Sequence, residues 1–104
     1  MSKRPIWTQK ALQQLDALDD YLLENAPQYA DRIINEIIRT PAELPLFPLK
    51  GQVEETLQPA GRYRYLVYSH YKIIYTVRNS DIYIMSLFDT RQDPSKMVGS
   101  VGEI

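Results

Sequence analysis

The fold is decided by residues 61–91, which read GRYRYLVYSHYKIIYTVRNSDIYIMSLFDTR. The stretch holds three runs rich in Tyr, Ile and Val, residue types that favour a pleated and partly buried surface. Two short turns, Ser69-His70 and Asn79-Ser80-Asp81, separate the runs and consist of residues that tolerate tight backbone geometry. The stretch therefore predicts a three-stranded antiparallel meander.

Alternation along each run predicts which face of the sheet a side chain occupies. The second run sorts Ile73, Tyr75 and Val77 against Lys72, Ile74, Thr76 and Arg78. The third run sorts Tyr83, Met85 and Leu87 against Ile82, Ile84 and Phe88. Both faces of the meander carry bulky side chains, so at least one of them must be covered by another part of the chain.

Two amphipathic helices are predicted upstream of the meander. Thr8 is a plausible N-cap for the first helix, which carries Ala11, Leu12, Leu15, Leu18 and Leu22 at helical spacing. Its opposite face carries Asp16, Asp19, Asp20 and Glu24, which we interpret as a solvated face. After the break at Asn25-Ala26-Pro27, the second helix has the stripe Ala30, Ile33, Ile34, Ile37 and Ile38. So short a break predicts an antiparallel helical hairpin packed on one face of the meander.

The remaining segments give weaker signals. Residues 5–8 suit a short edge strand. The spacing of a capping box at Thr40-Pro41-Ala42-Glu43 predicts that the second helix kinks there and continues for a turn, or restarts. We interpret residues 44–51 as a proline-rich connector rather than a docking motif, and residues 53–57 as a further short strand. Residues 95–104 are weakly patterned, which predicts a flexible tail that is either frayed or ordered by a partner.

Composition limits the class of protein. A chain of 104 residues with 44% hydrophobic and 24% charged residues predicts one small globular α+β domain spanning residues 1–104. The chain has no Cys, no apolar stretch long enough to span a membrane, and no signal-peptide core after Met1 to Pro5, so we expect a cytoplasmic protein. Its net charge of −1 argues against a protein that grips nucleic acid over a wide surface.

Few residues suggest chemistry. We find no phosphate-binding loop and no metal-ligand cluster, and we expect no cofactor. His70 is the only His and lies in a predicted tight turn. A two-residue hairpin turn is expected to stay away from Arg91, so we expect no catalytic role for His70. A local basic patch is predicted on the meander, because no acidic residue occurs between Gly61 and Ser80 whereas four basic ones do: Arg62, Arg64, Lys72 and Arg78.

The order of these segments is informative as a whole. A W-T segment leads into an amphipathic helix, the N-A-P break, an Ile-rich helix and a proline connector. There follow G-R-Y-R-Y-L-V-Y, Y-K-I-I-Y-T-V, I-Y-I and F-D-T-R-Q-D-P. From about residue 7 to residue 94 this pattern resembles the ParE/RelE family of toxins from bacterial type II toxin–antitoxin modules. The resemblance implies a helical hairpin packed on a small, curved, mainly antiparallel sheet, and a cognate antitoxin whose C-terminal segment wraps the toxin in a hetero-oligomer.

The resemblance implies two mechanisms. RelE-type members cut mRNA on the ribosome with the help of Lys and Arg, and that reading assigns Arg64, Lys72 and Arg91 to the phosphate. ParE-type members block DNA gyrase and need no catalytic residue. Phe88 and Asp89 stand where many nucleases place an acid or base, and Val98 falls near the RelE tyrosine.

We therefore favour a ParE-like gyrase inhibitor of the plasmid-stabilisation branch, which inhibits growth. An mRNA endoribonuclease is the alternative, and a non-toxic complex-forming module of the same fold is the third possibility. The target- or antitoxin-binding patch would comprise Arg62, Arg64, Lys72, Arg78 and Arg91.

Overall fold

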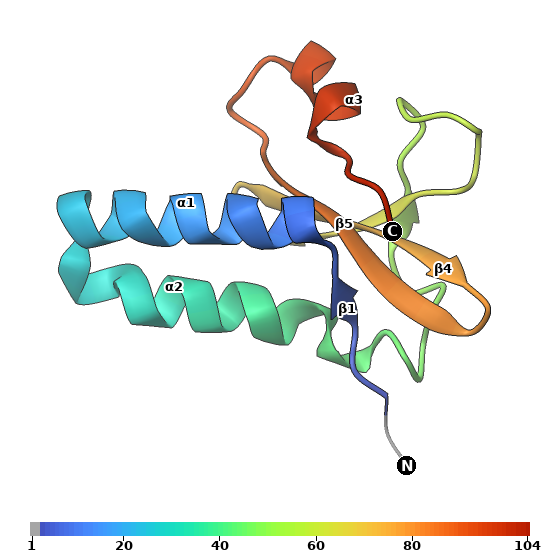
Figure 1. Ribbon diagram of the computed structural model, residues 1–104, viewed down its shortest axis with the longest axis horizontal. Helices are drawn as coiled ribbons and strands as arrows, with labels where there is room; N and C mark the ends of the chain where they lie inside the picture. Colours follow the sequence, from blue (N-terminus) through green and yellow to red (C-terminus); the bar gives the residue numbers. More distant parts are fainter. Residues whose placement is uncertain (1–2) are drawn as a thin grey trace.

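A computed structural model describes residues 3–104. Met1 and Ser2, which begin the segment for which we expect no signal-peptide core, lie outside the described residues. Within residues 3–104 a helical hairpin lies against a five-stranded sheet with the strand order β1-β5-β4-β3-β2 (Figure 1). The strands are β1 (Ile6–Trp7), β2 (Gln52–Val53), β3 (Arg64–Tyr68), β4 (Tyr71–Arg78) and β5 (Asp81–Asp89). The helices are α1 (Gln9–Asn25), α2 (Pro27–Arg39), α3 (Met97–Ser100) and the 3-10 turns η1 (Thr40–Glu43) and η2 (Pro94–Lys96). The predicted fold class is confirmed.

The helical hairpin packs on the sheet as predicted, but the buried apolar stripe of each helix is narrower than the sequence predicts. The Thr8 hydroxyl accepts a hydrogen bond from the Ala11 amide at 3.3 Å, which confirms the N-cap, and it donates to the Ile84 carbonyl at 2.9 Å, which ties α1 to β5. Ile37 is fully buried in the core between the helices and the sheet. Leu12 and Ile38 are each 45% exposed, so the outer edge of each predicted stripe faces solvent instead of the core.

The meander has the predicted turns but not the predicted alternation in β5. Ser69, Asn79 and Ser80 have positive φ angles, as tight hairpin turns favour. The register pairs Ile74 with Ser86 but Tyr75 with Ile84, so Met85 is an extra residue that forms a β-bulge. The bulge reverses the faces downstream of it. Leu87 therefore joins Ile82 and Ile84 in the core beneath the helices, whereas Phe88 packs with Ile74 on the other face.

That other face is covered in part by the C-terminal segment. Met97 packs with Leu57, Ile74 and Phe88 in a second buried cluster. The Gln14 side chain donates to the Ser100 carbonyl at 2.8 Å, so the segment is also held to α1. Residues 95–104, for which the sequence predicts a flexible or partner-ordered tail, are folded against this chain's own sheet and first helix.

The proline-rich connector is pinned to the sheet by one buried tyrosine. The Tyr75 hydroxyl donates to the Pro48 carbonyl at 2.7 Å and accepts from the Gly51 amide at 2.9 Å. A Cβ at Gly51 would lie 2.7 Å from the Tyr75 ring, so only glycine fits this approach. The connector nevertheless exposes three large apolar side chains, those of Leu46, Phe47 and Leu49.

The flanks of the connector follow the predictions in part. The second helix continues for one turn as η1, as predicted, but the Thr40 hydroxyl donates back to the Glu36 carbonyl at 2.7 Å, so the capping box does not form. The strand expected at residues 53–57 is instead the short β2, Gln52–Val53. It ends there because Glu54 begins a turn in which the Leu57 amide bonds to the Glu54 carbonyl.

Candidate functional site

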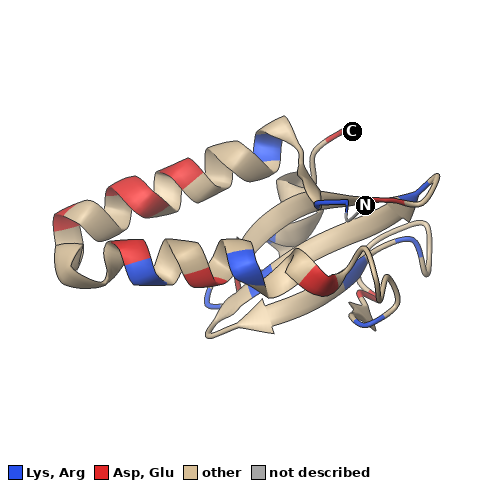
Figure 2. Ribbon diagram, turned by 90° about the horizontal axis from the view of Figure 1, so that it is seen from below, with Lys and Arg blue, Asp and Glu red and all other residues tan. Residues whose placement is uncertain are grey.

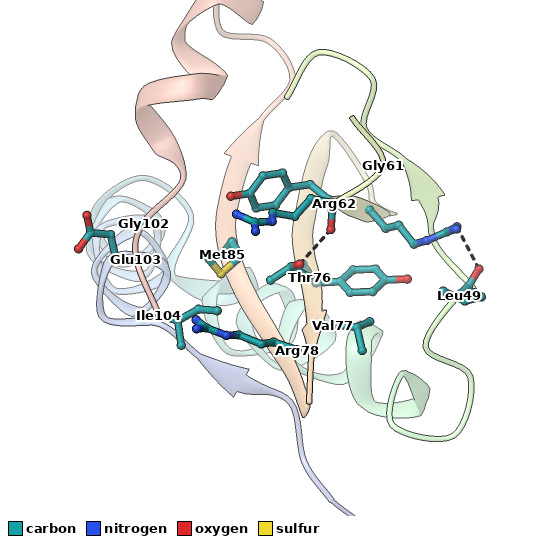
Figure 3. A pocket seen from close by; sticks show the side chains of 13 residues that line it. Leu49, Gly61, Arg62, Thr76, Val77, Arg78, Met85, Gly102, Glu103 and Ile104 are labelled. Atoms are coloured by element: carbon teal, nitrogen blue, oxygen red, sulfur yellow. Dashed lines mark hydrogen bonds between the residues drawn. The ribbon is translucent and has the colours of Figure 1, made fainter. Parts of the chain in front are cut away.

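The principal candidate site is a groove at the end of the sheet where β3 begins and β4 ends. It encloses about 760 Å³ and is lined by Arg62, Arg64 and Arg78, and we call it the arginine groove. Other lining residues are Leu49, Tyr63, Thr76, Val77, Met85 and residues 102–104. In Figure 3 the Arg62 and Arg78 side chains reach toward residues 102–104 with Met85 between them, while Leu49 stands on the opposite side.

The groove collects arginines that lack acidic partners. Among the ion pairs formed within residues 3–104, none involves Arg62, Arg64 or Arg78. Arg64 is partly engaged, since its Nη1 donates to the Gly51 carbonyl at 2.7 Å and to the Leu49 carbonyl at 3.4 Å. Arg62 and Arg78 are exposed. The groove is therefore a positively charged place on a chain whose net charge is −1.

Acidic residues gather elsewhere. The four acidic residues of α1 run along that helix, as Figure 2 shows. Glu103 is the acidic residue among those that line the groove. The near-neutral net charge thus conceals an uneven distribution, with acids along the first helix and unpaired guanidinium groups at one end of the sheet.

Lys72, the fourth basic residue of the predicted meander patch, is held in an internal ion pair. Its Nζ lies 2.5 Å from Oε1 of Glu54, whose side chain is only 4% exposed, and 4.1 Å from the centroid of the Tyr65 ring. Burial alone would raise the pKa of Glu54. The hydrogen bonds from Lys72 and Thr56 outweigh that effect and lower it, so the carboxylate stays charged beside the ammonium group.

Arg91 is also paired. Its guanidinium binds the Asp89 carboxylate through two bonds, Nε to Oδ1 at 3.1 Å and Nη2 to Oδ2 at 2.8 Å. These bonds, opposed by partial burial, lower the pKa of Asp89. The pair borders a second cavity of about 470 Å³, which lies between α1 and β5 and is also lined by Tyr21 and Tyr71.

The structure corrects the expected position of His70. The sequence predicts that the hairpin turn stays away from Arg91, but the Thr90 amide and hydroxyl both donate to the His70 carbonyl at 2.8 Å. The reason is the register of the sheet, which pairs Tyr71 with Asp89 and so carries the turn to the end of β5. The imidazole packs on the Tyr71 ring, with the ring centroids 4.2 Å apart.

The three residues assigned to a RelE-type site do not converge. Arg64 pairs with Tyr75 across the sheet, whereas Arg91 follows Asp89, which pairs with Tyr71. Four residues of strand separate those two positions, or roughly 13 Å. Lys72 and Arg64 point to opposite faces of the sheet. The Lys72 ammonium group lies over the ring of Tyr65, which packs on the second cluster, whereas alternation places Arg64 on the face of Leu66, which packs on the core beneath the helices. Among residues 3–104 there is also no group of three or more His, Asp or Glu side chains that could hold a metal ion.

Sequence reasoning missed two parts of these sites. It did not assign Glu54 as the partner of Lys72, because the two residues are 18 positions apart and no local pattern links them. It also missed residues 102–104 and Leu49 as walls of the arginine groove. No residue type in those segments signals a site, and only the folded chain brings them together.

The chain is thus an α+β protein in which a hairpin of two helices packs on a small, mainly antiparallel sheet with a basic groove at one end. A family model described as "ParE toxin of type II toxin-antitoxin system, parDE" matches residues 6–94, and the chain belongs to that family. The resemblance inferred from the sequence is confirmed.

A solved structure shares the fold of this chain. A chain of the "Chromosomal ParDE TA system from P. aeruginosa" is 20% identical and superposes with a TM-score of 0.70 over 85% of this chain and 96% of that chain. At this identity the match demonstrates a common fold. A comparison with curated protein sequences gave no significant match.

Proposed function

We propose that this ParE-family protein is a toxin that inhibits DNA gyrase by binding to it, and that a cognate antitoxin neutralises it in a hetero-oligomeric complex. Membership of the ParE toxin family supports the toxin–antitoxin part of the proposal. Gyrase is the target that the ParE branch implies, and its inhibition would act in the cytoplasm. No helix within residues 3–104 is long and apolar enough to cross a membrane.

The ion pair of Lys72 with Glu54 is the observation that carries the choice of mechanism. RNA cleavage of the RelE type would require Lys72 to contact the scissile phosphate. Here a nearly buried carboxylate already neutralises the ammonium group, and the Tyr65 ring covers it. Recruiting Lys72 to a phosphate would leave Glu54 charged and unpaired inside the protein, which is costly.

Asp89 is also poorly suited to transfer a proton at neutral pH. General acid–base help is typically worth about 100- to 10,000-fold in rate, and it needs a group with a pKa near the working pH. The pKa of Asp89 is lowered, principally by its hydrogen bond with Arg91, so its carboxylate is a weak base at neutral pH. These features favour a binding mechanism over catalysis.

Three assays distinguish the mechanisms. Purified protein should inhibit the supercoiling activity of gyrase, and expression without antitoxin should cause DNA damage and filamentation. Translating ribosomes given the protein should show no codon-specific mRNA cuts. Cuts that disappear in a folded Lys72→Met variant would refute the proposal and establish the RNase alternative. Formation of an antitoxin complex with neither activity would instead identify a non-toxic module.

A further inference from the structure

We propose that the proline-rich connector, residues 44–51, docks the toxin onto its protein target by inserting Leu46 and Phe47 into an apolar cleft that has an acidic rim. The inference rests on the proposed function in one respect, the naming of gyrase as that target. The residues of the connector and its neighbours define the chemistry of the partner surface.

The connector displays large apolar side chains that the fold does not use. Leu46 is 74% exposed, Phe47 57% and Leu49 67%, all within four consecutive positions. Leu44, at the start of the connector, is fully buried and anchors the segment in the core. Single apolar residues are normal on a protein surface, whereas an exposed apolar cluster marks an interaction site. The three exposed side chains are therefore available to a partner.

The connector holds these side chains in a fixed geometry. Two hydrogen bonds of the buried Tyr75 hydroxyl fix its backbone at the far end. At the near end the Glu43 carbonyl accepts hydrogen bonds from the Leu46 and Phe47 amides, each at 3.0 Å. A preorganised loop loses little conformational entropy on binding, which favours a partner of complementary shape. A fluid bilayer offers no such shape, so a folded protein is favoured over a membrane.

The docking mode differs from that of a proline-rich peptide ligand. A P-x-x-P ligand is recognised as an extended polyproline II helix. Pro45 and Pro48 instead lie in turns, which bend the connector back on itself. The contact is therefore made by the apolar side chains that the turns display and not by the prolines.

Cations beside the connector define the rim of the cleft. Leu49 lines the arginine groove, and its carbonyl accepts a hydrogen bond from Nη1 of Arg64 at 3.4 Å (Figure 3). Arg62 and Arg78 line the same groove and form no ion pair within residues 3–104. A partner seated on the connector would face these guanidinium groups, so its surface beside the apolar cleft should carry carboxylates.

Gyrase supercoiling and bacterial growth test the inference together. The test variant Leu46→Ser/Phe47→Ser removes both apolar contacts without changing the net charge. Its matched control is Leu12→Ser/Leu23→Ser, at two half-exposed positions on α1. We expect the test variant to require about 10-fold more protein, or more, for equal inhibition of supercoiling, because a few apolar anchors carry most of the affinity of an interface. Expressed without antitoxin at wild-type levels, it should no longer arrest growth, whereas the control should arrest it.

Arg62→Glu tests the acidic rim. The reversed charge should increase the concentration of protein needed to inhibit supercoiling by about 3-fold, because it would repel the carboxylates of the partner. Circular dichroism should show that all variants are folded. An unchanged potency of Arg62→Glu would overturn the acidic rim.

The growth assay does not depend on the identity of the target, so it separates the two proposals. If the wild type arrests growth without inhibiting gyrase, the proposed function fails, and a loss of growth arrest in Leu46→Ser/Phe47→Ser still supports docking onto another protein. Full potency of that variant, an equal loss in the control, or a wild type that inhibits neither gyrase nor growth would overturn the inference. Self-association, or binding to anionic vesicles, that disappears in the test variant would also overturn it and reassign the connector to a second copy or a lipid surface.

Discussion

Replacing Lys72 with methionine tests the internal ion pair most sharply. The substitution keeps an unbranched apolar side chain over the Tyr65 ring but leaves the Glu54 carboxylate, 4% exposed, without its cation. Removing one partner of a buried pair typically costs about 3–5 kcal/mol. Lys72 is 21% exposed and Thr56 still donates two bonds to the carboxylate, so we expect a loss of about 2–3 kcal/mol of a total stability of about 5–15 kcal/mol.

The effect should depend on pH in a defined direction. Burial opposes ionisation of Glu54, but the bonds from Lys72 and Thr56 prevail and lower its pKa. A lowered pKa stabilises the folded state above the unfolded pKa of about 4.3, and that contribution is lost as the pH falls through the folded value. The difference between the wild type and Lys72→Met should therefore be largest at neutral pH and shrink in acid, as the pH falls through the lowered folded pKa of Glu54 and the carboxylate becomes protonated in both proteins.

Urea unfolding followed by far-ultraviolet circular dichroism, at neutral and acidic pH, measures this difference. The double variant Glu54→Gln/Lys72→Met should recover part of the stability that Lys72→Met loses, because no buried charge remains. Lys50→Met is the control, since Lys50 pairs with an exposed Glu43 and should lose less than about 1 kcal/mol. Equal stability of Lys72→Met and the wild type at neutral pH, or a difference that grows in acid, would refute the reasoning.

Two further predictions concern the core and the connector. Ile37→Asp should prevent folding at ambient temperature, because an unpaired carboxylate at a fully buried position costs several kcal/mol. Leu12→Asp, at a half-exposed position, should leave a cooperative thermal transition. Similar thermal melting of the two variants would contradict the packing described above. Tyr75→Phe should destabilise the domain by about 1–3 kcal/mol, since it leaves the Pro48 carbonyl and the Gly51 amide without their partner, and faster amide exchange at Gly51 should report the loosened connector.

Local patterns were sufficient to predict most of the scaffold. The Thr8 cap, the break before Pro27 and the turns of the meander each depend on residues adjacent in sequence, and the structure has all of them. The helical stripes were predicted too broadly, because periodicity identifies the apolar side of a helix but not how far its neighbours extend. Ile38 lies at that margin.

The candidate site was less predictable because it depends on contacts between distant residues. The count of basic residues predicted one patch, but the fold divides it: Arg62, Arg64 and Arg78 line the groove, while Lys72 and Arg91 are each bound to a carboxylate. Composition cannot reveal that division. Glu54 also falls in the strand predicted at residues 53–57, and the pattern of that strand does not predict a contact between the Glu54 side chain and Lys72.

The bulge at Met85 affects how residue roles can be carried between relatives. Counting along β5 by strict alternation gives the wrong face for every position after Met85, because one extra residue has been inserted there. An aligned relative with a regular strand would need a one-residue gap at this point. Functional positions beyond it, including Asp89 and Arg91, should therefore be matched through the pairing of Tyr71 with Asp89 rather than by distance along the chain.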